Sequence, residues 1–206
     1  MSHDWGNKRN FKQHEIYGWA SSARISQYVD FVKKIKNGKI IEIGVYGGAS
    51  LLEICDICEN NQNIIFGIDP WETNNYSNGN LLNENTNPTL NEFHYHMSKN
   101  RKMLEKIIKE EKYDRFVNLI VEKASEASKK FDDKTIDLIY IDGAHDYRSV
   151  FQDLQIWYPK IKKSGLIWGD DYNWEGVQLA LHDFAKENKL SVTVLEDNGW
   201  VLSFDK

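Results

Sequence analysis

The chain contains little cysteine, little proline and no hydrophobic run long enough to cross a bilayer. Only two of its 206 residues are cysteines, which excludes a scaffold stapled by disulfides. Cys55 and Cys58 have the C-x-x-C spacing of redox and zinc motifs, but a structural zinc site needs a second pair of ligands, which we do not find. Both fall in a segment with helical periodicity, on one face with Leu51 and Leu52. We therefore expect buried core cysteines.

The sequence also lacks a basic cluster and a secretory leader. Its net charge is −5, so we expect no nucleic-acid partner. The start Met-Ser-His-Asp-Trp-Gly is not the basic and then apolar start of a signal peptide, and no apolar stretch approaches the ~20 residues of a membrane-spanning helix. We expect a cytoplasmic protein without a membrane partner. With 206 residues, 41% of them hydrophobic, the chain suits one domain with its own core.

Strand and helix patterns alternate along most of the chain. Short apolar runs predict strands over residues 39–43, 63–68, 116–121, 136–141 and 166–168. Apolar residues at helical spacing predict helices over residues 21–36, 49–60, 90–112, 147–159 and 175–188. Two last strands, 191–195 and 200–204, flank a hairpin turn signal and would form an antiparallel edge. This alternation predicts an α/β fold, in which helices cover both faces of a mostly parallel sheet.

Residues 1–206 are interpreted as a single domain with two accessory segments. Residues 1–38, polar with scattered aromatics, are expected to cap the main domain. Residues 70–91 are rich in turn formers and would form a lid-like insertion, because a loop of about 20 residues in a compact domain is usually functional or mobile. Four side chains near this insertion could contact a substrate or could equally be core or surface residues: Trp71, Tyr76, His94 and His96.

Three aspartates follow directly after two of the expected strands. Asp142 closes the run Ile136–Ile141, and Asp170 and Asp171 close the run Leu166–Gly169. The carboxyl ends of parallel strands line the edge where open α/β sheets bind ligands. Three carboxylates meeting there would repel one another unless they shared a cation or bound protons. We expect a site for a hard divalent cation, with helix capping by the acidic pair as the alternative.

A glycine-containing turn, Glu42-Ile-Gly44-Val-Tyr46-Gly-Gly48, connects the first of these strands to a helix. Glycine lets the backbone approach a ligand closely, and Asp69, at the end of the next strand, is placed to accept hydrogen bonds from ribose hydroxyls. The second glycine of a dinucleotide fingerprint is replaced by Tyr46, whose bulk obstructs a pyrophosphate. The pattern favours an adenosyl ligand without a pyrophosphate, and NAD is the alternative.

These segments resemble class I S-adenosylmethionine-dependent methyltransferases. Glu42–Ser50 looks like motif I of that class. Ile141-Asp-Gly-Ala-His-Asp-Tyr147 and Asp170-Asp-Tyr172 are similar in order and spacing to a metal-dependent branch that contains macrocin-type sugar O-methyltransferases. The resemblance covers residues 38–187 and implies a Rossmann-like seven-stranded sheet in the order 3-2-1-4-5-7-6. It also implies S-adenosyl-L-methionine as the methyl donor and Mg²⁺, or another divalent cation, as the cofactor.

The resemblance also implies roles for individual residues. The donor would be bound by Glu42, Gly44, Tyr46, Gly48, Ser50, Asp69, Ser125 and Asp142. In this set the glycine turn would hold the methionine part, Asp69 the ribose, and Ser125 lies in the segment lining the adenine. The cation would be bound by Asp142, Asp170 and Asp171.

The methyl group of a sulfonium donor is already electrophilic, but the acceptor hydroxyl is a poor nucleophile until it loses its proton. A bound cation lowers the pKa of the hydroxyl and a base removes the proton. Two residues compete as the base, His145 and Asp142, and His145 could instead make only a local hydrogen bond at a helix start. The expected function is O-methylation of a small hydroxylated acceptor, a sugar or natural-product intermediate. An NAD-dependent oxidoreductase and a non-catalytic donor-binding protein are the alternatives, and a homo-oligomer is an open expectation.

Overall fold

The computed structural model describes residues 7–71 and 88–204. A seven-stranded sheet has the order β5-β4-β3-β6-β7-β9-β8. Its strands are β3 (Lys39–Ile43), β4 (Ile64–Ile68), β5 (Val117–Ile120), β6 (Ile136–Ile141), β7 (Ile161–Gly169), β8 (Leu190–Val194) and β9 (Trp200–Phe204). When the seven strands are numbered from one in chain order, the sheet reads 3-2-1-4-5-7-6. The predicted order is therefore confirmed.

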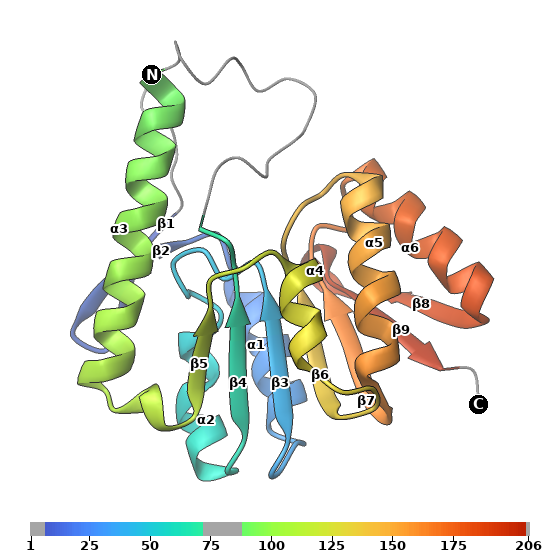
Figure 1. The fold of residues 1–206 in the computed structure, drawn as a ribbon, viewed down its shortest axis with the longest axis horizontal. Coiled ribbons are helices and arrows are strands. Elements are labelled where there is room, and N and C mark those ends of the chain that lie inside the picture. The colour runs from blue at the N-terminus through green and yellow to red at the C-terminus, as the bar shows by residue number, and fades with distance from the viewer. Residues whose placement is uncertain (1–6, 72–87, 205–206) are drawn as a thin grey trace.

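The strands β3 to β7 run parallel, whereas β9 pairs antiparallel with both β7 and β8. The predicted antiparallel edge is thus also confirmed. β3 lies at the centre, between β4 and β6. Because these strands are parallel, the segments that follow β3, β4, β6 and β7 emerge at one edge of the sheet (Figure 1). This edge carries the predicted site.

Helices cover both faces of the sheet (Figure 1). They are α1 (Ser22–Val32), α2 (Cys55–Asn60), α3 (Pro88–Glu110), α4 (Ala124–Ala127), α5 (Tyr147–Trp157) and α6 (Glu175–Asn188). Successive side chains of a strand point to opposite faces. Ile40 accordingly packs in one core with residues of α1, α2 and α3, and Ile41 in another with residues of α4, α5 and α6. Two apolar faces explain why the central strands appear in the sequence as continuous hydrophobic runs.

The N-terminal segment contains a β-hairpin that the sequence did not reveal. Strands β1 (Asn7–Phe11) and β2 (His14–Gly18) pair antiparallel. Most of β1 is polar and exposed, so it lacks the alternation that indicates a strand. The hairpin packs on the turn after β3, where a Cβ at Gly47 would lie 2.2 Å from the carbonyl oxygen of Tyr17. At its tip, the Lys12 ammonium donates to the Tyr113 hydroxyl at 2.6 Å.

Several predicted elements differ in extent, and two of the differences have a clear physical description. The helix predicted over 49–60 becomes α-helical only at Cys55, after a 3₁₀ turn at Leu52–Ile54. Cys55 and Cys58 are free and fully buried, as predicted. β7 begins at Ile161 rather than at residue 166, because its pairing with β6 continues across a register shift despite a polar sequence.

Most of the predicted lid-like insertion lies outside the described residues. Residues 72–87, which include Tyr76, lie outside the described residues, and so does the side chain of His94, on α3. Trp71, just before them, is buried. His96 lies on α3 and contacts the neighbouring ring of Tyr95 edge to face. Among the described residues, no helix combines the length and apolar character that crossing a membrane requires.

Candidate active site

The turn after β3 lies against the backbone that follows β6. Gly44 has a φ of 89° and Gly48 a φ of 78°, in the left-handed region that favours glycine. A Cβ at Gly44 would lie only 1.9 Å from the carbonyl oxygen of Asp142. Tyr46 also has a positive φ, and its ring stacks on Trp19 with the centroids 4.7 Å apart. The predicted donor turn and the predicted acidic site are therefore in direct contact.

Glu42 occupies a fully buried position in β3, beneath this turn. Its Oε1 accepts a hydrogen bond of 2.7 Å from the Ser50 hydroxyl. Its Oε2 has no hydrogen-bond partner in the described part of the chain. Burial, opposed in part by the Ser50 hydrogen bond, raises the pKa of Glu42 to about 8. Glu42 is therefore mostly neutral at pH 7, and a cationic group placed beside it would favour its ionised form.

Asp69 follows β4 and holds the turn in place. One carboxylate oxygen accepts the backbone N–H of Tyr46 at 2.9 Å, and the other accepts the backbone N–H of Trp71 at 2.7 Å. The Trp71 indole in turn donates to the Tyr46 carbonyl at 2.8 Å. Asp69 is buried, and burial raises its pKa. Since each carboxylate oxygen has a second lone pair, Asp69 can still accept hydrogen bonds from a ligand.

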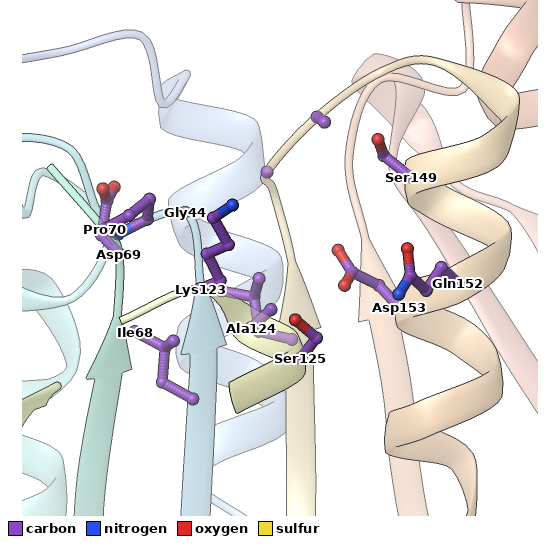
Figure 2. Close-up of a pocket in the computed structure, with 13 residues that line it drawn as sticks. Gly44, Ile68, Asp69, Pro70, Lys123, Ala124, Ser125, Ser149, Gln152 and Asp153 are labelled. Atoms are coloured by element: carbon purple, nitrogen blue, oxygen red, sulfur yellow. The ribbon is translucent and has the colours of Figure 1, made fainter. Parts of the chain in front are cut away.

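A hollow opens beside this turn, between the segments that follow β3, β4, β5 and β6 (Figure 2). It is lined by Ile43, Gly44, Ile68, Asp69, Pro70, Lys123, Ala124, Ser125, Gly143, Ala144, Ser149, Gln152 and Asp153. Of the predicted donor residues, Gly44, Asp69 and Ser125 belong to this lining. The hollow measures about 180 Å³, which is less than the ~300–1,000 Å³ of typical ligand pockets. A ligand seated in it would therefore extend beyond it along the edge of the sheet.

Asp153 of α5 directs its carboxylate into this hollow (Figure 2). Burial and the nearby charge of Asp146 raise the pKa of Asp153 to about 7, and no hydrogen bond from the described residues opposes this shift. Gln152 and Ser149 line the same wall. A carboxylate with a perturbed pKa that faces a hollow is a candidate ligand group.

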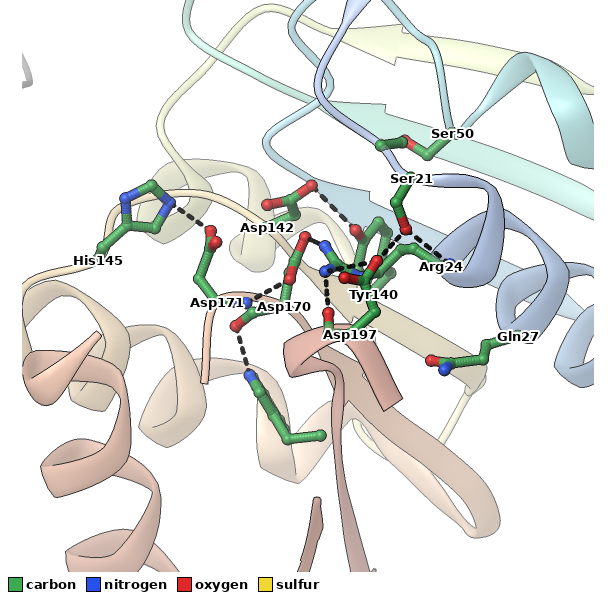
Figure 3. A network of polar contacts seen from close by, with 12 residues as sticks. Ser21, Arg24, Gln27, Ser50, Tyr140, Asp142, His145, Asp170, Asp171 and Asp197 are labelled. Carbon is green, nitrogen blue, oxygen red and sulfur yellow. Dashed lines mark hydrogen bonds and ion pairs between the residues drawn. The ribbon is translucent and has the colours of Figure 1, made fainter. Parts of the chain in front are cut away.

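Asp142, His145 and Asp171 converge at the same edge, after β6 and β7 (Figure 3). One ligand atom from each of the three lies within 4.8 Å of the others. His145 Nε2 lies 2.7 Å from Asp171 Oδ2, and the Tyr140 hydroxyl donates to Asp142 Oδ2 at 2.9 Å. The contact of His145 is thus made across the sheet edge and not within its own helix start, where Asp146 caps α5.

Asp170 takes a different place from the one predicted for it. Its Oδ2 forms an ion pair with Arg24 of α1, and its Oδ1 accepts the backbone N–H of Asp171 (Figure 3). The structure therefore brings together Asp142, His145 and Asp171, whereas the sequence predicted Asp142, Asp170 and Asp171. Neither carboxylate of the acidic pair caps α6, which has Trp174 as its N-cap residue and no side-chain cap.

Charge and burial raise the pKa values of Asp142 and His145. Burial, and then repulsion by Asp171, raise the pKa of Asp142 to about 7, against the opposing effects of Tyr140, Arg24 and His145. Burial lowers the pKa of His145, but the contact with Asp171 outweighs burial, so the pKa is raised overall. Asp142 can therefore gain and lose a proton near pH 7, as a general base must.

The sequence of this segment matches a known family. Residues 41–172, more than half of the chain, match the sequence model of a methyltransferase domain. The chain belongs to this methyltransferase family. The matched part of the methyltransferase starts in β3 and ends just after Asp171, so it includes the glycine turn, Asp69 and the acidic cluster. No curated protein matches the chain.

Solved structures share the fold of this methyltransferase. A Corynebacterium glutamicum protein has a TM-score of 0.66 at 11% identity, over 92% of this chain and 84% of its own. CalS11, a TDP-rhamnose 3'-O-methyltransferase of calicheamicin biosynthesis, has a TM-score of 0.60 at 14% identity, over 91% of this chain and 82% of its own. The Podospora anserina methyltransferase PaMTH1, bound to SAH, has a TM-score of 0.58 at 16% identity, over 91% of this chain and 81% of its own. The predicted Rossmann-like fold is thereby confirmed.

Arg24 and Asp153 are among the residues of the site that had no predicted role, although the sequence contained a signal for each. Arg24 lies on the same stripe of α1 as the buried residues Tyr28 and Val32, at intervals of four residues. A charged residue on a buried stripe indicates a partner inside the protein. Asp153 lies three residues after the buried Val150, close to the start of a helix that begins at the ligand edge. The sequence does not say which partner either residue meets.

Proposed function

We propose that this methyltransferase transfers a methyl group from S-adenosyl-L-methionine to a hydroxyl group of a small molecule. The observation that carries the proposal is the close approach of Gly44 to Asp142. This contact would place a donor held by the glycine turn next to a carboxylate whose pKa is about 7. The family match supports methyl transfer over the alternative of hydride transfer to NAD.

The donor would lie with its adenosine in the hollow of Figure 2 and its methionine part along the turn from Gly44 through Tyr46 to Gly48. Asp69 would accept the ribose hydroxyls. Around the adenine, Ser125 and Asp153 would form the polar contacts, with the Asp153 carboxylate accepting from an amino group.

Glu42 would add an electrostatic contribution to donor binding. Its neutral carboxyl group, held by Ser50, lies beneath the turn. The positive charge of the bound donor would lower the pKa of Glu42 and draw a proton off it. Donor binding would then release a proton near neutral pH.

Asp142, His145 and Asp171 fit a divalent cation. They offer two carboxylates and one imidazole within 4.8 Å, a donor set that suits Mn²⁺ better than the predicted Mg²⁺, which prefers oxygen ligands. Two ionised carboxylates would balance the charge of such an ion. When bound there, the ion would lower the pKa of an acceptor hydroxyl. The metal-dependent branch is therefore proposed with His145 in the place predicted for Asp170.

Asp142 would take the proton of the acceptor hydroxyl. Tyr140 holds one of its carboxylate oxygens at 2.9 Å, which orients the other toward the site. As the proton moves to Asp142, the hydroxyl oxygen forms a bond to the methyl carbon and the bond from that carbon to sulfur breaks, which leaves S-adenosylhomocysteine. His145, oriented by Asp171 and stacked on Trp174 with centroids 5.2 Å apart, is the second candidate for the base.

The acceptor would bind beside this cluster and the glycine turn, each of which carries one exposed indole ring. Trp174 stacks on His145 and Trp19 stacks on Tyr46, and both are about half exposed, at 52% and 51%. Exposed aromatic faces can pack against the apolar face of a ring-shaped substrate. CalS11 acts on the sugar of TDP-rhamnose, which supports a sugar as the acceptor.

The test is transfer of a labelled methyl group from S-adenosylmethionine to a panel of nucleotide sugars, simple sugars and phenols, with Mn²⁺, Mg²⁺ or a chelator. We expect transfer to one class of acceptor, stimulated by the cation. Asp142→Asn should lower the rate by about 100-fold or more and still bind S-adenosylhomocysteine. Donor binding without transfer to any class would favour a non-catalytic donor-binding protein, and transfer undiminished by chelator would remove the cation from the mechanism.

A further inference from the structure

A buried arginine from the N-terminal helix reaches the acidic edge of the sheet. Arg24 is only 6% exposed, and Figure 3 shows its guanidinium among the carboxylates that follow β6 and β7. It forms an ion pair with Asp170 and donates to the carbonyl oxygen of Asp197. Its Nε has no hydrogen-bond partner in the described part of the chain. An arginine is rarely buried unless it is paired, so Asp170 accounts for its position.

The pairing removes Asp170 from the set of available ligands. Asp170 is 8% exposed, with one oxygen on Arg24 and the other on the backbone N–H of Asp171. Of the three carboxylates that follow β6 and β7, only those of Asp142 and Asp171 then remain in the cluster, and His145 completes it. The Arg24 guanidinium, which also lies 3.8 Å from the Asp197 carboxylate, offsets the charge of Asp170. The carboxylates of Asp142 and Asp171 then remain to face a divalent cation.

We propose that Arg24 is a positioning residue that decides which side chains bind the cation: by holding Asp170, it leaves the third ligand position to His145. This inference rests on the proposed cation site. It assigns the N-terminal helix a part in building that site, although Arg24 itself would touch neither the ion nor the substrate.

The proposal has a consequence that a purely structural ion pair would not have. Without Arg24, the Asp170 carboxylate becomes free to bind the ion, and the site carries one more negative charge. The affinity for the ion should then rise, since oxygen ligands and their charge tune cation affinity. At the same time, His145 should become dispensable, because Asp170 takes its place.

The experiment is a Mn²⁺ titration, followed by the electron paramagnetic resonance signal of the free ion, on four proteins: the wild type, His145→Ala, Arg24→Met and the double variant. We expect His145→Ala to weaken Mn²⁺ binding about tenfold or more in the wild-type background, because losing even an outer-shell partner of a metal ligand has an effect of that size. In the Arg24→Met background, His145→Ala should weaken Mn²⁺ binding by less than about twofold. Arg24→Lys, which keeps the charge, should behave as the wild type.

Two further variants separate this effect from general destabilisation. Arg24→Gln combined with Asp170→Asn exchanges the ion pair for a neutral amide pair, and its Mn²⁺ affinity should stay within about threefold of the wild type and should still depend on His145. Arg115→Met breaks the exposed pair with Glu59 and should change nothing. Binding of S-adenosylhomocysteine reports that each variant is folded.

The outcomes distinguish this inference from the proposed function. Equal losses on His145→Ala in the two backgrounds, in a protein that does bind Mn²⁺, would overturn the role of Arg24 and leave the cation site standing. Absence of Mn²⁺ binding in the wild type would overturn both. A loss of about tenfold or more in the neutral-pair variant would show that Asp170 is itself a ligand, against the proposal.

Discussion

Replacing Glu42 by Gln should make the protein more stable at neutral pH, although it alters a residue of the proposed donor site. Glu42 is fully buried and its pKa is about 8 in the folded chain, against ~4.3 for an unperturbed glutamate. Gln keeps the shape of the side chain and its Oε1 can still accept the Ser50 hydrogen bond. The variant therefore removes the ionisation and little else.

The sign and size of the effect follow from proton linkage. Between these two pKa values the folded state binds a proton at Glu42 and the unfolded state does not, so the wild type loses stability as pH rises. One pKa unit corresponds to ~1.4 kcal/mol. Between pH 5 and pH 7, the free energy of unfolding of Glu42→Gln should therefore rise relative to that of the wild type by roughly 3 kcal/mol. The gap should level off above pH 8.

Urea unfolding of both donor-free proteins at pH 5, 6, 7 and 8 measures this gap, provided that the m-values agree. Ser50→Ala is the matched control, because it removes the hydrogen bond to Glu42 and keeps the ionisable group. Since that bond lowers the pKa of Glu42, the fall in stability of the control should extend to higher pH. Parallel pH profiles of the wild type and Glu42→Gln would refute the buried, neutral glutamate.

Three further predictions concern the site itself. Gly44→Ala should destabilise the chain by more than about 2 kcal/mol and abolish binding of S-adenosylhomocysteine, because its Cβ would meet the Asp142 carbonyl; a stable variant that binds normally would show that the turn moves aside. Asp153→Asn should weaken the binding of S-adenosylhomocysteine, measured by calorimetry, about tenfold or more. An unchanged affinity would show that Asp153 does not contact the adenine. His145→Ala should lower the methylation rate without altering the shape of its pH dependence if Asp142 is the base, whereas loss of an inflection near neutral pH would transfer that role to His145.

The sheet could be predicted from the sequence because each central strand is buried on both faces. Runs such as Ile136–Ile141 then carry a continuous apolar signal, and the acid or glycine after each run marks the ligand edge. The hairpin β1–β2 gave no such signal. Its strands are mostly polar, and what holds it is contact with distant residues such as Gly47 and Tyr113.

The site was predictable only in part, for a related reason. Gly44, Asp69 and Asp142 follow strands whose order was correctly predicted, so their convergence follows from the topology. The partner of Asp170, Arg24, lies more than 140 residues earlier in the chain, on α1. The apolar periodicity of α1 does not indicate which group its buried arginine will contact. Pairings across such separations are fixed by tertiary packing and leave no local pattern.

The most direct test of the central claim is calorimetric titration of the purified protein with S-adenosylmethionine, S-adenosylhomocysteine and NAD in parallel. We expect both adenosyl sulfur compounds to bind at one site per chain. S-adenosylmethionine, which carries the sulfonium charge, should also release a proton from Glu42, and this release should appear as a dependence of its binding heat on the buffer. NAD should not bind. Tight binding of NAD, with no heat from either adenosyl compound, would contradict the account.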